Sequence, residues 1–437
     1  MDMVAHNVGT HNNLEAAIED VDASRAYRYR LYPDSKRQKE IDEQIELARL
    51  LYNRLLEKAK DEYQKTRSFD IKKANFNRFL KEALSENREY GRLYSQTRQN
   101  VFVRLQRAYQ NFFRRVREKK AGKKVRAGFP RFKAMGRYAS LTYPQFGFHI
   151  DKERKCHMLR VSKIGGMKIE LHRPIEGVVK ALMIKKEAGD YYATFATVSE
   201  IKTPKVADTN PVGIDMGLKT FATLSDGRKI TKPNFARKAE THIARWQRIV
   251  ARREKGSRRR DKAKLQLERS WQTVNNQTKD FAFKAADDLI DSGYTSFAVE
   301  GLRIPNMLKN HRLARSIQNA SWSRFIQVLS SKAEEAGMGI TVVDPMNTSQ
   351  TCSECGQKYA MSLSDRTFSC DCGYSADRDI NAARNILNRA TAGHAGSHAR
   401  GDSATTVQQG SQVGSGKREH TPQEVSTISD AGEAHTL

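Results

Sequence analysis

Four cysteines fall within 21 residues of this 437-residue chain, and they constrain its fold more than any other feature. Cys352 and Cys355 form one pair, Cys370 and Cys372 form a second, and 14 residues separate the pairs. A glycine follows the second cysteine of each pair, so the backbone can curl around the thiolates. Four thiolates satisfy the tetrahedral preference of zinc and leave no open position for a substrate. The spacing predicts one structural Zn²⁺ ion; four cysteines without a metal are the alternative.

The charge of the chain indicates its class of partner. Lys and Arg number 77 against 50 Asp and Glu, which gives a net charge of +27. Residues 1–24 hold five acids and no Lys or Arg, and residues 391–437 hold five acids and three bases, so the remaining body carries +34. A compact body with this charge repels itself unless a polyanion neutralises it. Nucleic acid is therefore the expected partner.

Composition also excludes several classes of protein. No apolar run approaches the ~20 residues that span a bilayer, and the acidic N-terminus lacks the layout of a signal peptide. Five cysteines are too few for a secreted disulfide framework, so the paired ones indicate metal binding in a reducing compartment. Cys156 stands apart from the others, and we expect it to be an ordinary packed residue.

Hydrophobic periodicity gives a coarse order of elements. It predicts helices near residues 35–64, 92–119, 321–336 and 379–389, and single strands at 295–300 and 339–344. Residues 25–31 are predicted to form a strand with alternating faces, Tyr27, Tyr29 and Leu31 on one side. Residues 180–198 are predicted to form a hairpin that turns at 188–190, and residues 212–227 two short strands joined by a turn. Asp34 or Ser35 is the expected N-cap of the first helix. The predicted strands and helices together indicate a mixed α/β protein with more than one domain.

Three carboxylates stand at the ends of predicted elements. Asp215 ends the strand of VGIDMG, Glu300 ends the strand of FAVEGL, and Asp379 opens the small-residue helix DINAARNIL. An acid at the end of an apolar strand is unfavourable unless a cation meets it. Three converging acids could hold two Mg²⁺ ions, one activating water and the other stabilising the leaving oxygen of a phosphodiester. A helix cap or a surface ion pair is the alternative for each acid alone, and Asp377 competes with Asp379 for the cap.

Two basic stretches are the predicted contacts with phosphates. Residues 112–133 hold ten bases and one acid, and a basic helical stretch runs from about residue 234 to 292 with an interruption near 255–257. The bases that we expect to bind nucleic acid are Arg114, Arg115, Lys119, Lys120, Lys123, Lys124, Arg252, Arg253, Arg258 and Arg259.

Aromatic residues accompany both basic stretches. Tyr109, Phe112 and Phe113 could stack on bases, but their helical spacing is more typical of a core. We expect the same core role for Trp271 and Trp322.

Several of these segments match one known family in order along the chain. They are YRLYPDSKRQ, LLYNRLL, AYQNFFRRV, GFPRFK, GIDMGLKTFATLSDG, SFAVEGL and SQTCSECG…FSCDCGYSADRDINAARNIL. Over residues 25–390 the chain resembles TnpB, a family of transposon-encoded RNA-guided nucleases related to the compact type V CRISPR effectors. The resemblance implies that Asp215, Glu300 and Asp379 are the catalytic acids and bind two Mg²⁺ ions. Asp379 is preferred to Asp377 because the family's acid sits in D-x-N-A-A.

The resemblance also implies a multidomain α/β architecture. An N-terminal wedge β-barrel would be interrupted by a helical recognition domain, and a ribonuclease H-like (RuvC) nuclease domain by a zinc-ribbon insertion. The expected boundaries are 25–35 and 134–205 for the barrel, 36–133 for the recognition domain, 206–345 and 374–390 for the nuclease, 346–373 for the zinc module, and 1–24 and 391–437 for a disordered leader and tail.

The activity implied by the resemblance is that of an RNA-guided DNA endonuclease of a transposable element. It would cleave target duplex next to a short recognition motif by Mg²⁺-dependent phosphodiester hydrolysis. Its partners would be a guide RNA and target double-stranded DNA, with no membrane and one protein monomer per guide. The expected location is the cytoplasm of a prokaryote, with nucleoid association when the protein is bound to DNA.

Two other activities stay open. One is an RNA-guided DNA-binding protein that represses transcription without cleavage, which the three intact acids disfavour. The other is a transposase that joins strands with the same acids. The lack of an evident helix-turn-helix for transposon ends, and the long basic body, disfavour that activity.

Overall fold

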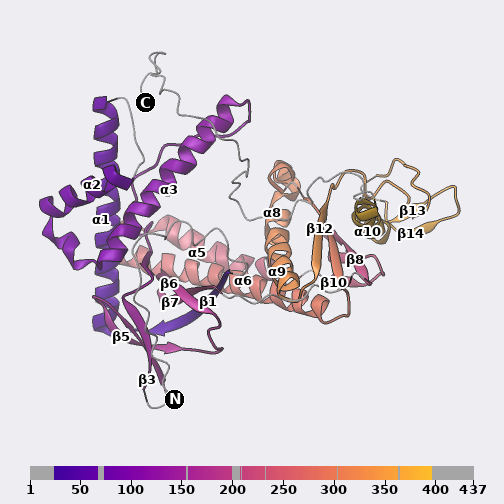
Figure 1. Ribbon diagram of the computed structural model, residues 1–437. Coiled ribbons are helices and arrows are strands. Elements are labelled where there is room, and N and C mark those ends of the chain that lie inside the picture. The colour runs from indigo at the N-terminus through magenta and orange to yellow at the C-terminus, as the bar shows by residue number, and fades with distance from the viewer. Residues whose placement is uncertain are drawn as a thin grey trace. The chain divides into compact units, whose positions relative to one another are not determined.

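The computed structural model describes residues 24–66, 73–153, 156–198, 207, 209–231, 233–302, 304–362 and 365–395 (Figure 1). Two compact units divide the chain, one formed by Met1–Pro204 and Asn234–Gln277 and the other by Lys205–Pro233 and Thr278–Leu437. The expected disordered leader and tail, 1–24 and 391–437, lie outside the described residues except at Ser24 and 391–395. Ser24 is the first residue of a strand, and residues 391–395 are the end of a helix. The predicted leader is therefore one residue too long, and the predicted tail begins five residues too early.

The first unit contains a seven-stranded sheet in which every pair is antiparallel. Its strands are β1 (Ser24–Tyr32), β2 (Ser140–Pro144), β3 (Phe148–Glu153), β4 (Cys156–Val161), β5 (Gly165–Glu170), β6 (Val178–Glu187) and β7 (Asp190–Val198), in the order β2-β6-β7-β1-β5-β4-β3. The predicted alternation of β1 is confirmed, because Tyr27, Tyr29 and Leu31 are all buried. The predicted β6–β7 hairpin turns at Ala188 and Gly189, both with positive φ.

Helices complete the first unit. They are α1 (Ser35–Thr66), α2 (Lys73–Glu86), the short 3₁₀ helix η2 (Arg88–Arg92), α3 (Ser95–Lys120), α4 (Phe235–Lys238), α5 (Glu240–Arg252) and the part of α6 (Arg258–Ile290) that ends at Gln277. Asp34 caps α1, because its Oδ1 accepts a hydrogen bond from the Arg37 backbone N–H at 2.7 Å. The predicted break in the basic helix falls between α5 and α6. Helix α2 was not predicted.

The aromatic residues of the helices fall into two groups. Tyr109 and Trp322 are fully buried in the cores of their units, as the spacing predicts. The prediction that Trp271 is a core residue is wrong, because its side chain is 40% exposed. Ser270 and Val274 are the buried residues of that turn of α6, and Trp271 lies about 100° around the helix from Ser270.

The second unit is built on a mixed five-stranded sheet, labelled in part in Figure 1. Its strands are β8 (Pro211–Met216), β9 (Thr220–Leu224), β10 (Lys229–Thr231), β11 (Ser296–Glu300) and β12 (Gly339–Val343), in the order β10-β9-β8-β11-β12. The first three form an antiparallel meander, whereas β11 and β12 run parallel to β8.

Both faces of this sheet are covered by helices. The helices are the end of α6 from Thr278, α7 (Ile304–Met307), α8 (His311–Ala320), α9 (Trp322–Glu335) and α10 (Arg378–Ala395). Ile214 and Val299 pack with Leu289 of α6 and Phe325 of α9 on one face. On the other face, Ala298 packs with α10 residues such as Ile386. Alternate residues of each strand therefore face the two layers.

A small antiparallel hairpin, β13 (Thr367–Ser369) and β14 (Ser375–Asp377), precedes α10 and carries the second cysteine pair in its turn. The segment between β12 and this hairpin carries the first pair. None of the helices within the described ranges is long and apolar enough to cross a membrane.

Candidate active site and metal centre

Asp215 and Glu300 stand at matching positions on neighbouring strands. In the parallel ladder of β8 and β11, the last pair is Ile214 with Val299, and each acid is the next residue of its strand. Paired residues of parallel strands point to the same face of a sheet, and successive residues alternate between faces. Because Ile214 and Val299 face α6 and α9, the two acids face the layer of α10.

Gly213 permits α10 to lie directly on this face of the sheet. A Cβ atom built on Gly213 would lie 2.1 Å from the carbonyl oxygen of Ala383 and 3.0 Å from Cβ of Leu387. Gly213 is two residues before Asp215 and shares its face, while Asp379 is one helical turn before Ala383. The close approach at Gly213 therefore brings the N-terminal turn of α10 toward the end of β8.

Electrostatic interactions connect the three predicted acids. The pKa of Asp215 is raised well above its ordinary value, chiefly by burial and then by the charges of Glu300 and Asp379, while Arg378 acts in the opposite direction. The Asp215 side chain is half-buried, yet its carboxyl group lies among enough protein atoms for burial to be the largest effect. Asp215 and Glu300 thus stand on neighbouring strands, and the charge of Asp379 acts on Asp215 from the first turn of α10. Converging carboxylates in a buried position are suited to divalent cations.

Glu300 is the most buried of these acids, with 7% of its surface exposed. Burial raises its pKa, and a hydrogen bond from Thr348 and the charge of Arg389 partly oppose that shift. The Thr348 hydroxyl donates to Oε1 of Glu300. Thr348 comes from the segment that leads to the first cysteine pair, so the acid and the cysteine segment are in contact.

Asp377 and Asp379 have different partners. Asp377 Oδ1 accepts a hydrogen bond from the Asp379 backbone N–H at 2.9 Å, and Asp377 Oδ2 lies 2.6 Å from Lys229 Nζ. Burial disfavours the Asp377 carboxylate, but the bonds from Lys229 and the Asp379 N–H outweigh it and lower the pKa of Asp377. Asp377 is therefore the N-cap of α10. The charges of Asp379 and Asp377 both raise the pKa of Asp215, and Asp379 has the larger effect.

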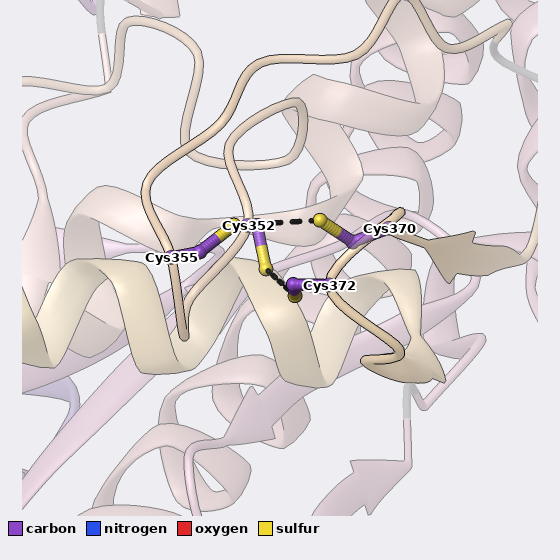
Figure 2. A group of neighbouring side chains, drawn as sticks. All are labelled: Cys352, Cys355, Cys370 and Cys372. Atoms are coloured by element: carbon purple, nitrogen blue, oxygen red, sulfur yellow. Dashed lines mark hydrogen bonds between the residues drawn. The ribbon is translucent and has the colours of Figure 1, made fainter.

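The four cysteines of the two pairs converge (Figure 2). All four Sγ atoms lie within 4.8 Å of one another. Cys352 and Cys372 approach to 3.8 Å, and Cys355 and Cys370 to 3.4 Å. A tetrahedral site with Zn–S bonds of about 2.3 Å requires S···S separations of about 3.8 Å. The cluster could therefore hold a zinc-sized ion, whereas Cys156 is a separate, half-buried residue of β4.

Tyr359 stands beside this cluster. Its hydroxyl oxygen accepts a hydrogen bond from the Asp371 backbone N–H at 3.2 Å, and Cys370 Sγ lies within hydrogen-bond distance of the same oxygen, at 3.5 Å. This contact is the main reason that the pKa of Cys370 is lowered to about 6. A hydroxyl that stabilises a thiolate also favours metal binding by that thiolate.

Three asparagines of α10 were missed by the sequence analysis. Asn381 donates to the Thr351 carbonyl at 2.8 Å, Asn385 donates to the same carbonyl at 2.6 Å, and Asn388 donates to the Ser353 carbonyl at 3.0 Å. They join the first cysteine segment to the helix that carries Asp379. Their spacing of four and three residues, which places them on one helical face, was the available signal.

The predicted nucleic-acid contacts all lie in the first unit. Eight are exposed and two, Arg115 and Arg253, are half-buried. The exposed residues are Arg114, Lys119 and Lys120 on the last turns of α3, Lys123 and Lys124 in the following loop, and Arg252, Arg258 and Arg259 at the junction of α5 and α6. Arg253 donates to the backbone carbonyl of Arg259 and so closes that junction. The exposed positions leave the charges accessible to a polyanion.

Comparison with known proteins places the chain in a family. Residues 193–311 match a profile described as "Probable transposase", and residues 322–386 match "Cas12f1-like, TNB domain". "TnpB-like protein L79" of Acanthamoeba polyphaga mimivirus is 26% identical over 238 residues, which cover 50% of this chain and 45% of that one. A protein of Streptomyces pristinaespiralis named "Putative RNA-guided DNA endonuclease" is 30% identical over 406 residues, which cover 91% of this chain and 96% of the other. The chain belongs to the TnpB family.

The fold of this TnpB-family chain is also found in a solved structure. The chain in "Cryo-EM structure of the Cas12f1-sgRNA-target DNA complex" superposes with a TM-score of 0.51 at 13% identity, covering 83% of this chain and 98% of the other. A third profile, "Helix-turn-helix domain", matches residues 23–68. In this TnpB-family member the described part of that range, residues 24–66, contains strand β1 and the uninterrupted helix α1 rather than two helices around a turn.

Proposed function

We propose that this protein is an RNA-guided DNA endonuclease of a transposable element. It would cleave target duplex beside a short recognition motif by Mg²⁺-dependent phosphodiester hydrolysis. The observation that carries the proposal is the convergence of Asp215, Glu300 and Asp379 from two neighbouring strands and the first turn of α10. The full-length relative named as an RNA-guided DNA endonuclease supports the substrate class.

The proposed catalytic residues are Asp215, Glu300 and Asp379, which would hold two Mg²⁺ ions. When bound, these ions supply an activated water and stabilise the charge on the leaving oxygen. Strands β8 and β11 place the carboxylates of Asp215 and Glu300 at neighbouring positions of the sheet. The N-cap Asp377 sets where α10 begins, and with it the position of Asp379. The raised pKa of Asp215 supports the need for a cation, because burial and the charges of neighbouring acids disfavour its ionised form.

The sheet order supports the proposed nuclease domain. A three-stranded antiparallel meander followed by two parallel strands is the arrangement expected of a ribonuclease H-like (RuvC) fold, here at residues 206–345 and 374–390. The proposed zinc ribbon, residues 346–373, would bind one structural Zn²⁺ ion through Cys352, Cys355, Cys370 and Cys372. We assign the seven-stranded antiparallel sheet to the wedge β-barrel (25–35 and 134–205) and the helices of 36–133 to the recognition domain.

The proposed partners are a guide RNA and the target double-stranded DNA, bound at one protein monomer per guide. Exposed bases at the end of α3 and at the α5–α6 junction are the proposed phosphate contacts, while base pairing with the guide would select the target. The proposed location is the cytoplasm of a prokaryote, with nucleoid association when DNA is bound.

Sequencing the copurifying RNA, followed by cleavage of a plasmid that carries its complement, tests the proposed function. One discrete RNA and cleavage that requires both its complement and Mg²⁺ are the expected results. A random sample of cellular transcripts would contradict guidance. Guided binding of the plasmid without cleavage would instead favour a repressor.

A further inference from the structure

Thr348 connects the cysteine segment to a catalytic acid. Its hydroxyl donates a hydrogen bond to Oε1 of Glu300, 48 residues away in the chain, and both side chains are buried. A hydrogen bond on one carboxylate oxygen fixes the plane of the carboxylate, and with it the direction of the second oxygen. The orientation of Glu300 toward a metal therefore depends on where Thr348 is held.

Helix α10 holds Thr348 in place. Asn385, itself buried, donates from Nδ2 to the Thr348 carbonyl at 2.9 Å and to the Thr351 carbonyl at 2.6 Å. Asn385 follows Asp379 by six residues on the same helix, so one rigid element carries an acid and anchors the loop that orients another. The hydrogen bonds from Thr348 to Glu300 and from Asn385 to Thr348 thus connect β11, the cysteine segment and α10.

We propose that Thr348 is a positioning residue for Glu300 and sets the affinity of the three acids for divalent metal. The proposal rests on the proposed function, since it assumes that these acids bind metal. Residues that orient a metal-binding carboxylate typically change metal affinity about 10- to 100-fold when they are removed. Serine retains the hydroxyl of Thr348, whereas valine keeps its shape without a donor.

The test compares Mn²⁺ binding, measured by electron paramagnetic resonance, in the full-length zinc-loaded chain freed of nucleic acid. Asp215→Asn identifies the signal that belongs to the acids. The variants are Thr348→Val, Thr348→Ser and the matched control Thr351→Val, which removes a hydroxyl from the same loop that donates to the Asn347 carbonyl instead. Zinc content and melting temperature are measured for each variant, so that Mn²⁺ affinity is expressed per folded, zinc-loaded chain.

We expect Thr348→Val to weaken Mn²⁺ binding about 10- to 100-fold, and Thr348→Ser and Thr351→Val to match the unmodified chain. In the guide-loaded protein, Thr348→Val should require more Mg²⁺ for cleavage and recover its rate at high Mg²⁺. Equal Mn²⁺ affinity in the Thr348→Val and Thr351→Val variants would overturn the proposal. Equal weakening by serine and valine at position 348 would also overturn it, because the serine variant keeps the hydroxyl.

Failure of the proposed function gives a different result. An unmodified chain that binds Mn²⁺ at the acids but does not cleave guided targets refutes the endonuclease, while the Thr348 comparison still decides the positioning role. If the Asp215→Asn variant binds Mn²⁺ as tightly as the unmodified chain, both the proposed active site and the positioning role of Thr348 are overturned.

Discussion

Gly213 of β8 lies directly against Ala383 of α10, so closely that a Cβ atom on the glycine would stand 2.1 Å from the Ala383 carbonyl oxygen. The Ala383 carbonyl belongs to the helix backbone and cannot rotate away as a flexible side chain can. A side chain at position 213 would therefore force α10 away from the sheet. Since α10 carries Asp379, the glycine determines how near this acid comes to Asp215. The absence of a single side chain at one position thus sets the geometry of the candidate active site.

Gly213→Ala should destabilise the protein by about 1–3 kcal/mol, because the added carbon overpacks the interface between β8 and α10. It should also reduce guided cleavage through the displaced Asp379. Denaturant unfolding and a plasmid assay measure the two effects. The matched control is Gly339→Ala in β12 of the same sheet, where a Cβ would meet only Ser296 Cβ at 3.7 Å. That control should change stability by no more than about 0.5 kcal/mol, and equal effects at both glycines would refute the explanation.

Asp377 and Asp379 should respond differently to alanine substitution. Asp377→Ala removes the N-cap of α10 and the ion pair with Lys229, so it should lower the free energy of unfolding by about 1 kcal/mol and keep guided cleavage. Asp379→Ala should abolish cleavage without that loss of stability. Cleavage by the Asp379 variant, together with its loss in the Asp377 variant, would show that the roles are reversed.

Asp215→Asn should raise the melting temperature of the protein in buffer without Mg²⁺. The folded state raises the pKa of Asp215, so this group destabilises the fold increasingly as pH rises from the ordinary aspartate range through the raised pKa. Asparagine removes that cost at neutral pH, and Mg²⁺ should stabilise only the unmodified protein. Calorimetry with and without Mg²⁺ measures both effects, with the exposed Asp291→Asn as control. A lower melting temperature for Asp215→Asn without Mg²⁺ would contradict the electrostatic argument.

Tyr359→Phe should weaken zinc binding by the cysteines about ten-fold, because Cys370 loses its hydrogen-bond contact with the Tyr359 hydroxyl. The Tyr359 contact is the largest of the effects that lower the pKa of Cys370 to about 6, so its removal should raise that pKa and cause zinc release at a higher pH. A chelator competition followed from about pH 8 to about pH 5 measures this change. The control is Tyr374→Phe, whose hydroxyl instead accepts from Arg384. Zinc release at the same pH in the Tyr359→Phe and Tyr374→Phe variants would show that Tyr359 does not stabilise the zinc site.

Much of the second unit could be predicted from the sequence. The segments around Asp215 and Glu300 are short apolar strands, with Asp215 next to last in β8 and Glu300 last in β11. The segment that begins at Asp379 forms a helix, as its apolar periodicity predicts. The predicted elements agree with the structure because burial of alternate residues is a local signal. The choice of Asp379 over Asp377 came from family resemblance, and the cap geometry now gives a physical reason for it.

Other features could not be predicted because they depend on partners distant in the sequence. Thr348 carries no periodic signal, and its contact with Glu300 exists only after β11 and the cysteine segment meet. Trp271 has the spacing of a core residue, yet its neighbour Ser270 occupies the buried face of α6. Helix α10 continues to Ala395, beyond the predicted end, since Ala390 still packs against the sheet.

The measurement that tests the central claim most directly pairs plasmid cleavage with a gel-shift assay, using the same guide RNA and target. Asp215→Ala, Glu300→Gln and Asp379→Ala should each abolish cleavage, because the two proposed Mg²⁺ ions need all three carboxylates. Each variant should still bind the target at the unmodified affinity, because the proposed binding depends on the exposed basic side chains of the first unit and on base pairing with the guide. Cleavage that persists in all three variants would contradict the assignment of these acids as the active site.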